Sequence, residues 1–304
     1  AGVIYGPNGL LLLAPLPGGR WISFQDLDED VTTVTPEEVA ARVELRLGGT
    51  YRPTDVGWLA PFRMHRRIVS RLSDGQRFLI GDAAHVSSPF GGEGLNAGLH
   101  DGYDLAWKLA LVLRGAASQS LLEGYAVERH LADLHVLDVS DQVHCSIMDA
   151  ADTVRQGREV HAEVVDPIAA ALVRNSRAMI DVDYAGSPLV VDYAETNGAG
   201  DEARPGLWYR DRSKFGGTSH HVLVFGTLTD GAPLAQLGRR WSQHVQIAHN
   251  PSVDRQRAGV KAEGVILIRP DGHIGFRYAT ADGEALAALE RHLGSYLVAD
   301  ADVA

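Results

Sequence analysis

The sequence has little cysteine and no dense basic cluster, and each shortage excludes a class of function. One cysteine, Cys145, stands among 304 residues, which rules out an intrachain disulfide and a multi-cysteine metal site. This usage is typical of a reducing cytoplasm, where we expect the protein to reside. The 28 basic residues are outnumbered by 39 acidic ones, for a formal net charge of −11, so we expect neither a nucleic-acid surface nor an anionic-membrane surface.

Long hydrophobic runs are absent as well. The longest apolar run, residues 10–16, is too short to cross a bilayer, and the first residues lack the charged and apolar regions of a signal peptide. With 45% hydrophobic and 22% charged residues, the chain has the composition of a globular protein with two domains and a third small element. It opens on Ala1-Gly2-Val3, almost at once in strand-like sequence, which suggests that something upstream was removed, although processing would leave the same trace.

Turn residues divide the first third of the chain into short elements. Prolines and paired glycines between two apolar segments predict a strand hairpin, and Ser73-Asp74-Gly75 predicts a turn. A helix is predicted over residues 35–47, because Thr35, Pro36 and Glu38 form an N-cap, a first-turn proline and a capping box. The predicted strands are residues 10–13, 20–24, 56–64 and 78–80.

The middle of the chain is predicted to be helical. Apolar residues recur with helical spacing over residues 95–113 and predict one buried stripe, made of Leu95, Leu99, Ala106, Leu109 and Leu113. Ser120 and Glu123 open a further helical stretch that continues with interruptions to about residue 180. The last third follows the order strand, helix, strand, hairpin, helix, which predicts a small α/β layer domain.

The segment over residues 77–114 has the composition of a cofactor site. Asp82 follows the predicted strand, where a carboxylate accepts hydrogen bonds from sugar or ribityl hydroxyls. Side-chain-free glycines and the first amides of a helix follow, and such amides favour negative charge. On spacing alone, a structural loop with packing glycines explains the segment equally well. Gly92-x-Gly94-x-x-Ala97 also matches the dinucleotide fingerprint, which we reject because it does not directly follow a strand and no acidic residue stands at the required distance.

The same residues carry a family resemblance. GDAAHVSSPFGGEGLNAGLHDGYDLAWKLA, residues 81–110, resembles the second FAD-binding motif of the flavin-dependent aromatic hydroxylases, which include phenol and polyketide hydroxylases. GYAVERH, residues 124–130, resembles the next helix of that family, and APLPGGRW, residues 14–21, a strand pair of its substrate domain. VILIRPDGHIGFRY, residues 265–278, resembles the thioredoxin-like C-terminal domain of the phenol and polyketide hydroxylase branch.

The resemblance implies an α/β (α+β) fold in three parts. Residues 1–72 would be part of a substrate-binding domain with a mixed sheet, 73–184 the second half of the FAD-binding domain with long helices, and 185–304 the thioredoxin-like domain. It also implies an FAD enzyme that takes electrons from NADPH or NADH and hydroxylates a phenolic or polyketide ring through a flavin C4a-hydroperoxide. No general base is identified.

The family's site residues transfer to this sequence position by position. Asp82 would hold the ribityl or phosphate side of FAD, Pro89 would lie beside the ring, and the residues that open the helix would contact the pyrimidine edge. The full set of cofactor residues is Gly81, Asp82, Pro89, Gly91, Gly92, Gly94, Leu95, Asn96 and Ala97. Trp21, Phe24 and Phe90 are candidates for the substrate pocket, although aromatic residues more often belong to a core.

Two family features are absent from the sequence. The N-terminal G-x-G-x-x-G segment, which binds the ADP half of FAD, and an internal Asp-Gly motif are both missing, so we expect poor affinity for FAD alone. The missing half could be a separate chain, and the alternative is a non-catalytic module that keeps the fold. Without C-x-x-C, the last domain is expected to serve packing or homodimer formation. The histidines lack ligand spacing, so we expect no metal, and His85 is expected to organise its loop by a hydrogen bond.

Overall fold

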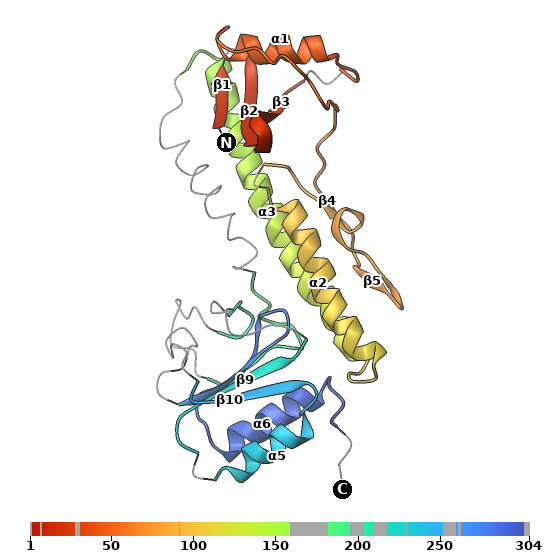
Figure 1. Ribbon diagram of the computed structural model, residues 1–304, viewed down its shortest axis with the longest axis vertical. Coiled ribbons are helices and arrows are strands. Elements are labelled where there is room, and N and C mark those ends of the chain that lie inside the picture. Colours follow the sequence, from red (N-terminus) through yellow and green to blue (C-terminus); the bar gives the residue numbers. More distant parts are fainter. Residues whose placement is uncertain are drawn as a thin grey trace. The chain divides into compact units, whose positions relative to one another are not determined.

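The computed structural model describes residues 2–6, 8–27, 31–90, 92–158, 182–194, 204–209, 218–228, 230–251, 260 and 263–300 (Figure 1). They fall into two compact units. The first unit gathers Ala1–Arg66, Ser87–Gly91 and Asp138–Ser176. The second gathers Arg67–Val86, Gly92–Leu137 and Arg177–Ala304. The predicted domain boundaries, after residues 72 and 184, stay a prediction.

The first unit contains a three-stranded antiparallel sheet in the order β1-β2-β3. The strands are β1 (Gly2–Gly6), β2 (Gly9–Leu16) and β3 (Arg20–Gln25). The short 3-10 helix η1 (Pro17–Gly19) turns the chain between β2 and β3, with Gly18 at a φ of +77°. The hairpin predicted from the prolines and glycines is therefore confirmed.

Helix α1 (Pro36–Arg46) confirms the predicted capping box. The Glu38 amide donates to Thr35 Oγ1 at 3.2 Å, and the Thr35 amide donates to Glu38 Oε2 at 2.8 Å. The strand predicted over residues 56–64 is wrong, because that segment has no regular structure. Pro61 has no amide to donate and Gly57 disfavours strand geometry, so neither can support a sheet ladder there.

Two small hairpin pairs open the second unit. Strand β4 (Arg67–Ile68) pairs with β7 (His85–Val86), and β5 (Ser73–Asp74) pairs with β6 (Arg77–Phe78) around the predicted turn. The strand predicted over residues 78–80 ends earlier, at Phe78. A 3-10 helix, η2 (Gly81–Ala83), follows, so Asp82 lies in a tight turn and not directly at a strand end.

Helices α2 (Gly94–Leu113) and α3 (Ser120–Arg155) confirm the predicted helical middle of the chain. The continuation expected to about residue 180 lies, from residue 159 on, outside the described residues. The predicted buried stripe of α2 is wrong. Leu95, Leu99 and Leu113 are 77%, 63% and 81% exposed. The buried face is the opposite one, made of Ala97, Asp101, Asp104, Leu105, Trp107, Lys108 and Leu111.

The end of the chain forms a five-stranded mixed sheet in the order β10-β9-β11-β12-β8. Strand β9 is parallel to β10 and antiparallel to β11, which pairs with β12. The strands are β8 (Val191–Asp192), β9 (His220–Phe225), β10 (Val245–His249), β11 (Gly264–Ile268) and β12 (Ile274–Tyr278). The predicted mixed α/β (α+β) class is confirmed, while the thioredoxin-like resemblance stays a prediction.

Helices α5 (Ala232–Arg240) and α6 (Gly283–Gly294) cover one face of this sheet (Figure 1). Alternate residues of β9 face opposite sides: Val222 and Val224 pack with the helices, while Leu223 and Phe225 pack in a second cluster. The larger core also takes in Trp107 of α2. Across the described ranges, every helix falls short of the combined length and apolar character that a membrane crossing demands.

Candidate functional site

The turn at Gly81 is packed closely against α2. Gly81 has a φ of +55°, a left-handed conformation that glycine adopts without strain. A Cβ atom built on Gly98 would lie 3.1 Å from Gly81 Cα, so the close approach of the two backbones depends on glycine at position 98. The glycines therefore hold η2, and Asp82 within it, beside the first turns of α2.

A buried carboxylate of α2 reinforces this contact. Asp101 Oδ2 accepts hydrogen bonds from the Gly81 amide and from His85 Nε2, both at 2.9 Å. Asp101 is fully buried, and His85 is nearly so. The prediction that His85 organises its loop by a hydrogen bond is confirmed.

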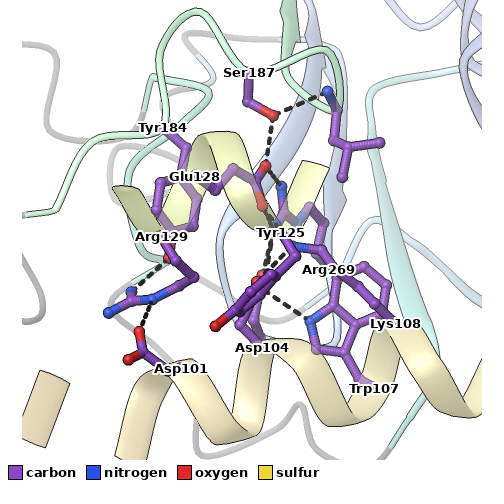
Figure 2. Close-up of polar contacts among 12 residues, drawn as sticks. Asp101, Asp104, Trp107, Lys108, Tyr125, Glu128, Arg129, Tyr184, Ser187 and Arg269 are labelled. Atoms are coloured by element: carbon purple, nitrogen blue, oxygen red, sulfur yellow. Dashed lines mark hydrogen bonds and ion pairs between the residues drawn. The ribbon is translucent and has the colours of Figure 1, made fainter. Parts of the chain in front are cut away.

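An arginine of α3 completes this first polar cluster (Figure 2). Arg129 Nε donates to Asp101 Oδ1 at 2.7 Å, and Arg129 Nη2 donates to Asp133 Oδ1 at 3.2 Å. Burial alone would raise the pKa of Asp101, but His85 and Arg129 outweigh it and lower that pKa. Burial raises the pKa of Asp133 to about 6 in spite of Arg129. For His85, burial would lower the pKa, but Asp101 and Asp133 raise it overall.

The amino end of α2 has no side-chain cap. Its N-cap residue is Glu93, and the first backbone bond runs from the Ala97 amide to the Glu93 carbonyl at 2.9 Å. The preceding amides of the helix have no partner within it and carry the positive end of its dipole. Glu93 is buried, and burial raises its pKa.

The other residues predicted to hold a cofactor are mostly accessible. Asp82, Gly92, Leu95 and Asn96 are exposed, whereas Ala97 is buried. Gly92 has a φ of +71° and Gly94 begins α2. Pro89 is exposed and belongs to the first unit, and Gly91 lies outside the described residues. Within the second unit, the predicted set thus gathers at η2 and the start of α2.

The three candidate substrate residues differ in their surroundings. Trp21 on β3 is 62% exposed. Phe24 of the same strand packs edge-on against Phe62, with ring centroids 6.1 Å apart. Phe90 is buried in a cluster with Leu10, Val143 and Ile147. Of the three, Trp21 is the one that offers a free aromatic face, and Phe90 has the environment of a core residue.

A second buried ionic cluster was not predicted from the sequence (Figure 2). Lys108 Nζ lies 2.6 Å from Asp104 Oδ2 and 2.7 Å from Glu128 Oε2. Arg269, which follows β11, donates through Nη2 to Glu128 Oε2 at 2.7 Å and also binds Asp271. The Asp104/Lys108 spacing of four residues was the available sequence signal, because such residues share one helix face. The cluster joins α2 and α3 to the C-terminal sheet.

Each cluster brings three potential metal ligands together, and each also contains basic side chains that pair with the carboxylates. His85, Asp101 and Asp133 form one group, and Asp104, Glu128 and Asp271 form the other. Arg129 in the first cluster, and Lys108 and Arg269 in the second, form ion pairs with these carboxylates. Burial alone would raise the pKa of Glu128, but Arg269 and Lys108 lower it to about 2. Burial raises the pKa of Asp104 to about 6, against the effect of Lys108.

Two parts of the sequence match known protein families. Residues 18–140 match an FAD binding domain, and residues 196–296 match the C-terminal domain of aromatic-ring hydroxylases. The chain belongs to the FAD-dependent aromatic-ring hydroxylases. The first match includes η2, α2 and the part of α3 that carries Glu128 and Arg129.

Curated relatives of this chain include two monooxygenases from Streptomyces species. The chain is 31% identical to 6-methylpretetramide 4-monooxygenase of Streptomyces rimosus, over 90% of this chain and 55% of the relative. It is also 31% identical to tetracenomycin B2 monooxygenase-dioxygenase of Streptomyces olivaceus, over 84% of this chain and 49% of the relative. The chain therefore spans about half the length of the curated relatives it matches.

Solved structures show the same fold. The flavin-dependent monooxygenase PieE, in complex with FAD and substrate, superposes with a TM-score of 0.72 at 20% identity, over 95% of this chain and 60% of that one. A ternary complex of aklavinone-11 hydroxylase with FAD and aklavinone gives a TM-score of 0.71 at 24% identity, over 94% and 56%. Both similarities cover nearly the whole of this chain.

The residues of the second unit fit the flavin of this family. Asp82 presents an exposed carboxylate, which suits ribityl hydroxyls. The uncapped amino end of α2 presents amides and a positive dipole, which suit the negatively charged pyrimidine edge of a reduced flavin. Close backbone approach at Gly81 and Gly98 holds these two features together.

Proposed function

We propose that this chain supplies the ring and ribityl half of an FAD site in a monooxygenase that hydroxylates a phenolic or polyketide ring. The match of residues 18–140 to an FAD binding domain carries the proposal, because it includes both η2 and α2. The names of the relatives, which act on tetracycline-type and tetracenomycin-type compounds, favour a fused aromatic substrate. NADPH or NADH is the proposed reductant.

Each residue of the site has a proposed task. Asp82 accepts hydrogen bonds from the ribityl chain, the Leu95 and Asn96 amides bind the pyrimidine edge, and Ala97 holds this turn through its own helical bond to Glu93. Gly92 and Gly94, which have no side chain, let the backbone approach the ring closely. Bound FAD supplies the redox and oxygen-activating chemistry of the reaction. The chain orients the ring, holds the substrate and excludes water.

Substrate contact is assigned to the first unit. Trp21 offers an exposed indole from β3, and Phe24 lies on the same strand. Aromatic side chains stack on a planar ring without a strict directional requirement, which suits a fused polycyclic substrate. Phe90, buried with Val143 and Ile147, belongs to the core of the same unit.

We further propose that a dinucleotide-binding segment outside this sequence completes the cofactor site. The exposed leucines of α2 support this, because Leu95, Leu99 and Leu113 form an apolar face that water solvates poorly. The matched relatives are about twice as long as the part aligned to this chain, so they contain polypeptide that has no counterpart here. Such a segment would bind the ADP half of FAD and cover this face.

The test is flavin titration of the chain joined to the dinucleotide-binding segment of 6-methylpretetramide 4-monooxygenase. We expect FAD to bind, with Asp82→Asn raising the Kd about tenfold, the equivalent of one charge-assisted hydrogen bond. Asp74→Asn is the matched control, because Asp74 is also an exposed carboxylate of the same small hairpin region. Absence of flavin binding, together with absence of NADPH- or NADH-dependent hydroxylation of a phenolic polyketide, would contradict the proposal and favour a non-catalytic module.

A further inference from the structure

Asp101 lies directly behind the residues assigned to flavin. It is fully buried, and its two carboxylate oxygens receive three donors from three segments of the chain. The Gly81 amide and His85 Nε2 both donate to Oδ2 at 2.9 Å, and Arg129 Nε donates to Oδ1 at 2.7 Å. The Asp101 carboxylate therefore links Gly81, the residue before Asp82, to helix α2 and to helix α3.

The Gly81–Ala83 turn is held on its far side by backbone bonds, since the Val69 amide donates to the Ala84 carbonyl at 2.9 Å and β7 pairs with β4. It is one 3-10 turn with no side-chain cap, and its own backbone bond runs from the Ala84 amide to the Gly81 carbonyl at 2.8 Å. The close contact with Gly98 limits how near the turn can lie to α2, but a van der Waals contact does not fix the orientation of the turn. The hydrogen bond from Gly81 to Asp101 fixes that orientation.

The same helix carries the other flavin contacts. Leu95, Asn96 and Ala97 open α2, and Asp101 follows on its buried face. Fixing Gly81 to Asp101 therefore fixes the distance between the Asp82 carboxylate and the amino end of α2. A cofactor that contacts both at once requires that distance to be constant, since a ligand gains most from groups already held in the binding geometry.

We propose that Asp101 is a positioning residue of the flavin site, which holds Asp82 in register with the amino end of α2 while His85 and Arg129 hold the Asp101 carboxylate. This rests on the proposed function, in which Asp82 and the α2 amides contact the flavin. Asp101 itself is buried and acts through Gly81.

Asp104 is a matched control on the same helix. It is also a buried carboxylate of α2, paired with Lys108 at 2.6 Å. Its side-chain partners among the described residues are Lys108, Trp107 and Arg269, and none of them lies in η2. Asp101→Asn and Asp104→Asn therefore remove the same charge from the same helix. Only the first alters the side chain that accepts from the Gly81 amide, because it replaces one of the two accepting oxygens with an NH2 group and removes the charge.

The first measurement is amide hydrogen exchange of the full 304-residue chain, without flavin. We expect Asp101→Asn to speed exchange at Gly81–Ala84 about tenfold relative to the rest of the second unit, and Asp104→Asn to leave that ratio unchanged. Urea unfolding of each variant supplies the correction for global stability. Equal acceleration of all amides by Asp101→Asn, or the same local effect in Asp104→Asn, would overturn the proposal.

The second measurement is titration with FAD and with FMN, with the dinucleotide-binding segment supplied as above. Since the residues held by Asp101 touch only the ring and ribityl part, Asp101→Asn should raise the Kd of both flavins by the same factor, about tenfold. Unchanged flavin affinity in a variant whose turn exchanges faster would overturn the positioning role. Failure of the wild-type protein to bind either flavin would instead refute the proposed function, while the exchange result would still decide whether Asp101 holds the turn.

Gly98→Ala is the second variant if Asp101→Asn does not fold. It keeps every charge of the cluster but places a Cβ 3.1 Å from Gly81 Cα, so it pushes the turn away from α2. The expected result is the same local increase in exchange and the same parallel loss of FAD and FMN affinity, by a smaller factor. No change in either quantity would contradict the proposal.

Discussion

Arg269 binds both carboxylate oxygens of Glu128, although the two residues are 141 positions apart. The pair fixes the loop after β11 to α3. Other buried charged side chains surround it. Asp104, Glu128 and Asp271 face Lys108 and Arg269, so carboxylates outnumber cations in this cluster. Because negative charge is in excess, removing a cation should destabilise the cluster more than removing any one carboxylate.

The two halves of this pair should therefore differ in their effect on stability. Arg269→Met leaves three buried carboxylates with Lys108 alone, and we expect it to lower the free energy of unfolding by about 3–5 kcal/mol. Glu128→Gln leaves two carboxylates with two cations, so the expected loss is smaller. Urea denaturation of both variants measures the difference. Equal losses would show that the charge balance does not govern this cluster.

The exposed leucine face of α2 gives a second prediction. Leu113→Lys should change the free energy of unfolding of the chain by less than about 0.5 kcal/mol, because Leu113 is 81% exposed. Leu111→Ala, two residues earlier on the buried face, should lower it by about 2–4 kcal/mol through the cavity it leaves. Thermal or urea unfolding compares the two. A large loss in Leu113→Lys would mean that the chain itself covers this face.

Local rules explain what could be predicted from the sequence. The β2–β3 hairpin and α1 follow from prolines, glycines and a capping box, all of which act within a few residues. The strand expected over residues 56–64 failed because the apolar content of the segment was weighed above Pro61 and Gly57. In each case, the backbone chemistry of a few residues decided the outcome.

Tertiary contacts decided the rest. Helix α2 has two faces able to be buried, one of leucines and one that carries Asp101, Asp104 and Lys108, and periodicity favours the leucines. The ionic face is buried because α3 and the C-terminal sheet bring Glu128 and Arg269 to it. The motif residues at Gly81 and Asp82 were identified through a family resemblance. The support that Asp101 gives them depends on a fold that no short-range pattern specifies.

The capping box of α1 is a third point of test. Thr35→Ala removes the acceptor of the Glu38 amide and should lower the free energy of unfolding by about 1 kcal/mol. Thr33→Ala is the control, since Thr33 is exposed and precedes the helix. Urea unfolding followed by far-ultraviolet circular dichroism measures both. A loss in Thr33→Ala equal to that in Thr35→Ala would argue against capping as the cause.

His292 should make the fold sensitive to acid. It lies on the buried face of α6, with its ring near those of Phe276 and Tyr296, and Nε2 has no hydrogen-bond partner among the described residues. Burial lowers its pKa from 6.5 to about 4. Between pH 6.5 and about pH 4, His292 is therefore protonated in the unfolded chain but neutral in the folded chain. Stability is at its full value above pH 6.5 and falls as the pH drops towards 4, by roughly 3 kcal/mol from this residue.

His292→Phe removes both the titrating group and the unsatisfied nitrogen. We expect the variant to lose less stability than the wild-type protein between pH 7.5 and pH 4.5, measured by urea unfolding at each pH. His220, whose pKa burial lowers to about 3, keeps part of the acid sensitivity in the variant. Burial raises the pKa of Asp104 and of Asp133 to about 6, so these two acids favour the folded state as the pH falls and oppose the histidines. The exposed His135, changed to Gln, is the control and should leave the pH dependence as it is. An unchanged dependence in His292→Phe would show that His292 takes up its proton without unfolding the domain.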